Sequence, residues 1–188
     1  MLEVEMKFPV KDLSSLERRL ADSGAVEAET LDEADRYFNA PDRDFARTDE
    51  ALRLRRIGAS NFVTYKGPKL DAQTKTRTEV EVPLAPGDAT AEAFTRLLVH
   101  LGYRPVAVVR KRRRTFRLKR NGFELEIALD DVEQVGQYAE LEIQAPEERL
   151  QGARNVLLET AAALGLTKSE RRSYLELLLS LPSARPCS

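Results

Sequence analysis

Glu3-Val4-Glu5-Met6-Lys7, near the start of the chain, is the stretch that decides the fold. Side chains of a β-strand point alternately to its two faces, so Glu3, Glu5 and Lys7 share one face while Val4 and Met6 share the other. The stretch therefore predicts a strand with one charged and one apolar face. A half-buried antiparallel strand with a solvated face has the same pattern, so its meaning depends on whether the pattern recurs.

The alternation does recur in most of the segments that we predict to be strands. Leu52 and Leu54 oppose Arg53 and Arg55, and glutamates alternate with apolar residues in later segments. The Asn121-Gly122 pair is a strong signal for a hairpin turn. One segment is extended but irregular, and we count it as a strand. The chain thus has about eight predicted strands, at residues 3–7, 26–39 (the irregular one), 51–57, 62–66, 77–84, 106–119, 124–130 and 140–143.

Three longer segments have the apolar spacing of helices. Asp12 can N-cap the first, Asp88 or Thr90 the second, and Pro146 sits well in the first turn of the third. A short helix is predicted at 173–181. Because each longer helix has one apolar stripe, we expect about three to four helices to cover the apolar faces of the strands in an α+β fold.

Length and composition limit the class of protein. The 188 residues suffice for a single domain, which we predict at 1–181 with a disordered tail at 182–188 and a mobile, lid-like loop at 67–76. The net charge is −1, from 30 Lys and Arg against 31 Asp and Glu, which argues against a general nucleic-acid or membrane-surface binder. The single cysteine, Cys187, excludes a disulfide framework and a thiolate metal site. Without a signal peptide or an apolar run of about 18 residues, we expect a cytoplasmic protein, either monomer or homodimer.

The charged strand faces need an explanation of their own. Charged residues make up 32% of the chain, above the usual level of about 25%. Closing an eight-stranded sheet removes its edges and leaves an interior about large enough for one small ligand. We therefore predict a closed eight-stranded antiparallel β-barrel, or tunnel, with a charged interior. An open sheet with its charged face in water is the alternative.

Basic and acidic clusters that face one cavity suit a triphosphate and its cation. Arg and Lys bind phosphate oxygens, while Asp and Glu supply the oxygen ligands that Mg²⁺ prefers. The lone His100 lies off the apolar stripe of its helix and is predicted to be a surface residue, which excludes a nucleophilic triad. The chain has neither a Walker-type phosphate loop nor a dinucleotide fingerprint. Of the reaction classes considered, cation-assisted phosphoryl or nucleotidyl transfer is the one that remains.

Seven charged elements follow one another along the chain: Glu3-Val4-Glu5-Met6-Lys7, Leu52-Arg53-Leu54-Arg55, Tyr65-Lys66-Gly67-Pro68, Arg77-Thr78-Glu79-Val80-Glu81, Lys111-Arg112-Arg113, Asp130 and Glu140-Leu141-Glu142. With these elements the sequence resembles the CYTH family, or triphosphate tunnel metalloenzymes, which includes class IV adenylyl cyclases, thiamine triphosphatases and inorganic triphosphatases. The resemblance spans almost the whole chain and implies an eight-stranded antiparallel tunnel with a divalent cation, Mg²⁺ or Mn²⁺, held by acidic side chains. The segment 132–138 and the ending Arg172-Ser173-Tyr174-Leu175-Glu176 are most similar to the cyclase branch.

Position by position, the resemblance implies two sets of site residues. The metal set is Glu3, Glu5, Asp130, Glu140 and Glu142, with Glu79, Glu81 and Glu126 as additional candidates. The triphosphate set is Lys7, Arg53, Arg55, Lys66, Arg77, Lys111 and Arg113, and the late basic residues Lys168, Arg171 and Arg172 are further candidates. Within the triphosphate set, the expected catalytic residues are Lys7, Lys66, Lys111 and Arg113.

Three functions remain open at this point. The first is conversion of ATP to cyclic AMP and pyrophosphate, with the ribose 3′-hydroxyl attacking the α-phosphorus. The second is a triphosphatase that releases orthophosphate from tripolyphosphate, thiamine triphosphate or a nucleotide, with water attacking the γ-phosphorus. The third is a non-catalytic module that binds RNA or polyphosphate through Arg110-Lys111-Arg112-Arg113-Arg114. Near neutrality argues against the third, so we expect a small-molecule triphosphate as partner and neither nucleic acid nor membrane.

Overall fold

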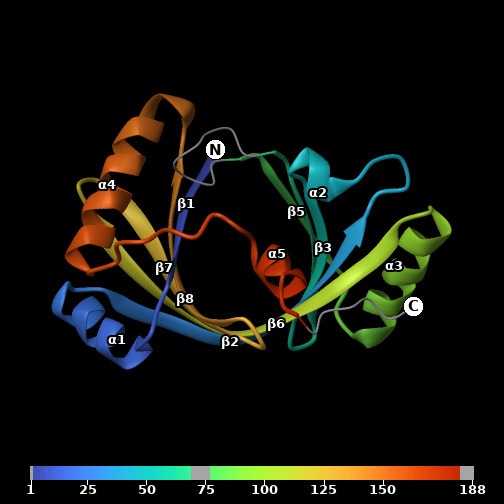
Figure 1. Cartoon of the computed structure of the whole chain (residues 1–188), viewed down its shortest axis with the longest axis horizontal. Coiled ribbons are helices and arrows are strands. Elements are labelled where there is room, and N and C mark those ends of the chain that lie inside the picture. The colour runs from blue at the N-terminus through green and yellow to red at the C-terminus, as the bar shows by residue number, and fades with distance from the viewer. Residues whose placement is uncertain (1, 69–76, 183–188) are drawn as a thin grey trace. The chain divides into compact units, whose positions relative to one another are not determined.

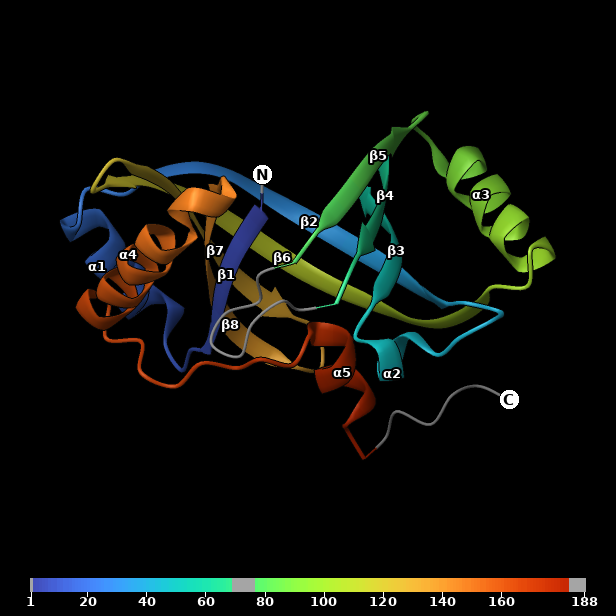
Figure 2. The same ribbon diagram turned by 90° about the horizontal axis from the view of Figure 1, so that it is seen from above.

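The computed structural model describes residues 2–68 and 77–182 (Figures 1 and 2). Residues 69–76 and 183–188, where we predicted most of a mobile loop and a disordered tail, lie outside that range. The strands are β1 (Leu2–Pro9), β2 (Val26–Asn39), β3 (Ala51–Ile57), β4 (Ser60–Lys66), β5 (Glu79–Leu84), β6 (Arg104–Arg120), β7 (Phe123–Val132) and β8 (Gly136–Ala145). The helices are α1 (Leu13–Asp22), α2 (Phe45–Thr48), α3 (Asp88–His100), the 3₁₀ helix η1 (Glu147–Arg149), α4 (Leu150–Ala163) and α5 (Tyr174–Leu179).

All eight strands belong to one sheet, in the order β1-β8-β7-β6-β2-β3-β4-β5. Neighbours with a defined register, such as β1 with β8 and β3 with β4, run antiparallel. The predicted α+β fold with an eight-stranded antiparallel sheet is therefore confirmed. β1 and β5 are the end strands of this order, and closure of the sheet into a tunnel stays a prediction.

The chain divides into two compact units. Among the described residues, unit 1 contains 2–31, Arg77 and 112–171, and unit 2 contains 32–68, 78–111 and 172–182. The long strands β2 and β6 each contribute residues to both units.

The core of unit 1 lies between one face of β1, β8 and β7 and the helices α1 and α4 (Figure 1). Ile127 and Leu141, which stand opposite each other on β7 and β8, are completely buried in it together with Val4 of β1 and Leu157 of α4. Each such apolar side chain contributes about 1.5–3 kcal/mol when it leaves water. Asp12 caps α1 as predicted, because its carboxylate accepts a hydrogen bond of 3.0 Å from the backbone N–H of Ser15.

Unit 2 has a smaller core, in which Ala91 and Leu98 of α3 pack with Phe38 and Leu54 of the strands. The predicted caps of this helix were wrong, since its N-cap is Gly87. Gly87 has φ +98°, a backbone conformation that favours glycine, and its N–H donates to the carbonyl of Ala59 at 2.7 Å.

β2 has the predicted bounds, and it is a continuous strand of 14 residues although its sequence looked irregular. Other elements differ from the predictions. The four-residue helix α2 was not predicted, and Pro146 precedes η1 rather than standing inside α4. β5 begins at Glu79, while Arg77 forms only an isolated bridge with Glu3. Within residues 2–68 and 77–182, every helix is too short or too polar to cross a lipid bilayer.

Candidate functional site

The polar face of unit 1 is the sheet face opposite its helices. Glu5 on β1 stands directly opposite Glu142 on β8, which in turn stands opposite Glu126 on β7. We call these three residues the carboxylate row. Directly opposed side chains on neighbouring strands lie close enough for like charges to destabilise the sheet. Such an arrangement favours a bound cation.

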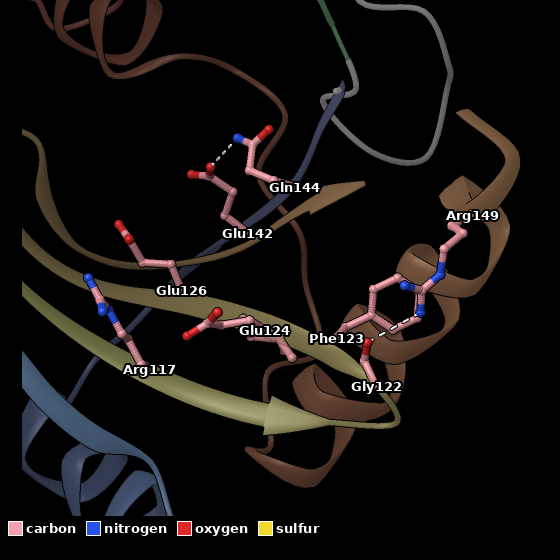
Figure 3. Close-up of a pocket in the computed structure, with 9 residues that line it drawn as sticks. Arg117, Gly122, Phe123, Glu124, Glu126, Glu142, Gln144 and Arg149 are labelled. Carbon is pink, nitrogen blue, oxygen red and sulfur yellow. Dashed lines mark hydrogen bonds between the residues drawn. The ribbon is translucent and has the colours of Figure 1, made fainter. Parts of the chain in front are cut away.

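A pocket of about 510 Å³ adjoins this row (Figure 3). Glu126 and Glu142 line it together with Arg117 of β6 and Gln144 of β8. The Nε2 of Gln144 donates to Glu142 at 2.8 Å, which orients that carboxylate. The carboxylate row therefore borders a space large enough for a small ligand.

A second group on the same face centres on Arg113. Its guanidinium donates to both oxygens of Asp130, at 2.7 and 2.6 Å, and also to Glu140. Asp130 is completely buried. Lys7 stands opposite Glu140 in the β1–β8 register, is 1% exposed, and has its Nζ 5.7 Å from the ring centroid of Tyr138. Two predicted metal ligands, Asp130 and Glu140, are thus partners of a predicted phosphate-binding arginine.

The polar face of unit 2 has an alternating row of charges, which we call the ion-pair chain: Arg53, Asp35, Arg55, Glu33 and Lys111. Asp35 accepts from Arg55 Nε and Nη2, each at 2.7 Å, and from Arg53 Nη1 at 3.2 Å. The Oε2 of Glu33 lies 2.9 Å from Arg55 Nη2 and 3.2 Å from Lys111 Nζ. The Nζ of Lys111 is also 5.3 Å from the ring centroid of Tyr174 in α5. Three predicted phosphate-binding residues are therefore joined by two carboxylates.

Burial and charge act in opposite directions on these groups. Burial alone would raise the pKa of Asp35, but the charge of Arg53 and the hydrogen bonds from Arg55 hold this pKa well below its ordinary value of 3.8. Burial and the negative charge of Asp35 raise the pKa of the neighbouring Tyr37 hydroxyl. Asp35 is thus an anion and Tyr37 a neutral phenol over the physiological pH range.

The remaining predicted residues also have definite positions. Lys66 on β4 forms an ion pair with Glu79 of β5, and Glu81 accepts from the hydroxyl of Thr64 at 2.9 Å. Glu3 lies opposite Gln144, and Arg77 is 7% exposed at its bridge with Glu3. The further candidates Lys168, Arg171 and Arg172 are exposed after α4.

Sequence reasoning missed Glu33, Asp35 and Tyr37. All three lie on the polar face of β2, and the first two are the carboxylates of the ion-pair chain. The available signal was the alternation of Glu33, Asp35 and Tyr37 itself. It was overlooked because Asp and Glu are uncommon in strands and the residues before them have no apolar period.

The donor chemistry of the carboxylate row fits a divalent cation. Mg²⁺ keeps several waters and usually takes only one or two protein carboxylates, completing its shell with substrate phosphates. Among the described residues, no group of three or more Asp, Glu, His or Cys side chains is arranged to hold a metal ion without such help. The predicted metal set stays a prediction, in which Glu5 and Glu142 are the best placed pair.

Comparison with known proteins places the chain in a family. The sequence model of the CYTH domain family matches residues 1–174 of this chain. The chain belongs to the CYTH domain family. This CYTH protein is 36% identical over 180 residues to MJ0240 of Methanocaldococcus jannaschii, described as a candidate adenylate cyclase, and the match covers 94% of this chain and 98% of that one.

Solved structures of CYTH relatives agree with the fold. PH1819 of Pyrococcus horikoshii is 35% identical, with a TM-score of 0.83 and coverage of 94% of this chain and 98% of that one. HpAC1 of Hippeastrum, described as a candidate adenylyl cyclase with a dominant triphosphatase activity, has a TM-score of 0.67 over 94% of this chain and 93% of that one. It is 15% identical, so this likeness concerns the fold alone.

Proposed function

We propose that this CYTH protein is a metal-dependent enzyme that acts on a triphosphate, and that it converts ATP to cyclic AMP and pyrophosphate. The observation that carries the proposal is the burial of cationic side chains on the polar sheet faces. Lys7, Arg55 and Lys111 are 1%, 9% and 6% exposed. Lysine and arginine are seldom buried to this extent unless paired. In the ion-pair chain of unit 2, three cations share two carboxylates, and this excess of buried positive charge supports a strongly anionic ligand.

Within this proposal the basic residues bind phosphate oxygens. Arginines such as Arg53 and Arg55 suit contacts with phosphate, because the guanidinium stays charged and presents its N–H groups in fixed directions. Lys7, Lys66, Lys111 and Arg113 would stabilise the charge that grows on the phosphates as the reaction proceeds. Glu5 and Glu142 would hold Mg²⁺ or Mn²⁺, which neutralises phosphate charge when bound.

The choice of cyclisation over hydrolysis is supported by the relative of 36% identity that is described as a candidate adenylate cyclase. In cyclisation, the ribose 3′-oxygen forms a bond to the α-phosphorus, the bond from that phosphorus to the bridging oxygen breaks, pyrophosphate leaves and the hydroxyl proton is released. In hydrolysis, water attacks the γ-phosphorus and orthophosphate leaves. Both reactions use the same phosphate and cation contacts.

Phosphorus NMR of the products tests the proposal directly. The purified protein is incubated with Mg²⁺ or Mn²⁺ and ATP, tripolyphosphate or thiamine triphosphate in turn. Cyclic AMP and pyrophosphate without orthophosphate are expected from ATP. Orthophosphate as the only new product would replace the cyclase by a triphosphatase, and no turnover of any substrate would refute both.

A further inference from the structure

We infer that Asp35 and Glu33 are positioning residues, which set the orientation of the cations that bind the triphosphate. The inference rests on the proposed function, since it concerns how Arg53, Arg55 and Lys111 are presented to that substrate. Both carboxylates lie on β2, outside every motif that identifies the family in this sequence. Their exposed fractions are 3% for Asp35 and 5% for Glu33.

The contacts of Asp35 fix one edge of a guanidinium. Its two oxygens accept from Arg55 Nε and Nη2, a two-point contact that defines the plane of that guanidinium. Among the described residues, the hydrogen bonds of Arg55 leave Nη1 as its remaining donor nitrogen. Asp35 also holds Arg53 through Nη1, while Arg53 Nε lies 3.4 Å from the hydroxyl of Thr64.

Glu33 connects Arg55 to the third cation of the chain, Lys111. Its Oε2 lies within ion-pair distance of both Arg55 and Lys111, but at angles that make no hydrogen bond. The contact therefore locates the two cations by charge more than by direction. The whole ion-pair chain belongs to unit 2, and its charges add to one net positive charge from three cations and two anions.

Removing the charge of Asp35 should have opposite effects on triphosphate binding, depending on whether Asp35 acts only through its charge or positions the arginines. Asp35→Asn removes one negative charge beside two arginines, so the more positive site should attract a triphosphate more strongly if charge alone mattered. Positioning predicts weaker binding and slower turnover, because a misplacement of about 1 Å in a positioning group can cost on the order of 10²-fold in rate. The sign of the change separates the two explanations.

Glu50 offers a matched control in the same unit. Its carboxylate, 7% exposed, binds Arg43 Nε at 2.8 Å and Nη2 at 2.9 Å, a two-point pair like that of Asp35 with Arg55. It also accepts from the hydroxyl of Tyr65, whose side chain points away from the polar face that includes Thr64. Glu50→Gln therefore removes a comparable pair without touching the ion-pair chain.

The experiment measures tripolyphosphate binding by titration calorimetry and ATP turnover for the wild type, Asp35→Asn, Glu33→Gln and Glu50→Gln. We expect Asp35→Asn to lower kcat/KM for ATP by about 10²-fold and to weaken tripolyphosphate binding. Asp35→Glu, which keeps the charge, should recover part of kcat. Glu50→Gln should keep the dissociation constant within about twofold of wild type, as for independent sites.

Each outcome decides a separate question. Wild-type binding or turnover in Asp35→Asn, or tighter binding, would overturn the inference while the proposed function stands. If Asp35→Asn does not fold, Glu33→Gln decides in its place, with weaker binding supporting the inference and unchanged binding overturning it. A wild-type protein that neither binds nor converts any triphosphate would refute the proposed function, and the inference with it.

Discussion

Arg113 shows that a single residue of the predicted triphosphate set also holds the fold together. For an expected catalytic residue such as Arg113, replacement by alanine would be expected to remove activity and leave the fold intact. The structure changes that expectation, because Asp130 is completely buried and receives two charge-assisted hydrogen bonds from Arg113. Removing one member of a buried ion pair leaves the other with an uncompensated desolvation cost.

Arg113→Ala should therefore lower the free energy of unfolding by about 3 to 5 kcal/mol, measured by urea denaturation without metal. The control is the double variant Arg113→Ala with Asp130→Asn, which removes the buried charge as well and should recover part of this loss. If Arg113→Ala alone were as stable as wild type, the pair would contribute nothing to the fold, and Arg113 would be free to serve the ligand only.

Lys111→Ala tests a neighbouring residue on the same strand. Within the proposed function this lysine contacts phosphate oxygens whose charge grows in the transition state, and losing such a contact costs about 2.7 to 4 kcal/mol, or on the order of 10²- to 10³-fold in kcat/KM. Arg110→Ala is the control, since Arg110 is exposed and points to the other face of β6. Equal losses in both variants would remove Lys111 from the active site.

At the scale of elements, alternation along a strand predicted well which residues share a face. The charged face of β1 and the arginines of β3 were assigned correctly from spacing alone, because each strand has an apolar face buried under helices. Partners across strands could not be predicted in the same way. They depend on register, which hairpin turns fix for only some pairs, and β1 pairs with the distant β8.

β8 illustrates how register separates two similar residues. Glu140 and Glu142 share one face, yet Glu140 receives the guanidinium of Arg113 whereas Glu142 stands between Glu5 and Glu126. The resemblance to the CYTH family implied the same metal-binding role for both residues. Their different neighbours predict opposite effects on stability.

Glu142→Gln should leave the metal-free protein as stable as wild type or more stable, because it removes one of three opposed negative charges. Glu140→Gln, its control on the same strand, should lower the melting temperature, because Arg113 loses a negatively charged hydrogen-bond partner. Thermal melts in chelator measure both. Added Mn²⁺ should then raise the melting temperature of wild type more than that of Glu142→Gln. Equal destabilisation of the two variants in chelator would refute the carboxylate row as a metal site.

Although the net charge of the whole chain is only −1, many of its charged side chains form local ion pairs. The run Arg110-Lys111-Arg112-Arg113-Arg114 reads as a basic patch, but its members alternate between the faces of β6. Lys111 and Arg113 have carboxylate partners on the polar face, and Arg114 binds Glu17 and Glu27. A continuous phosphate-binding surface for RNA therefore has little support in the structure.

Ion pairs of this kind also make the free energy of unfolding depend on pH. Hydrogen bonds from Arg43, Thr48 and Tyr65 lower the pKa of Glu50 from 4.5 to about 2, and the pKa of Asp35 is also depressed. A carboxyl group with a depressed folded-state pKa stabilises the fold above its unfolded-state pKa, and this contribution is lost as pH falls through the folded-state pKa.

The free energy of unfolding should therefore fall steeply between about pH 4.5 and pH 2 for the wild type. Glu50→Gln should be less stable than wild type at pH 7, because it loses the charged pair with Arg43. Its stability should decline less over the acid range, since glutamine does not titrate, so the two curves converge towards pH 2. Urea denaturation at a series of pH values measures this convergence. Parallel curves from pH 7 to pH 2 would show that Glu50 titrates alike in the folded and unfolded states, and would refute its assignment as an anion held by Arg43.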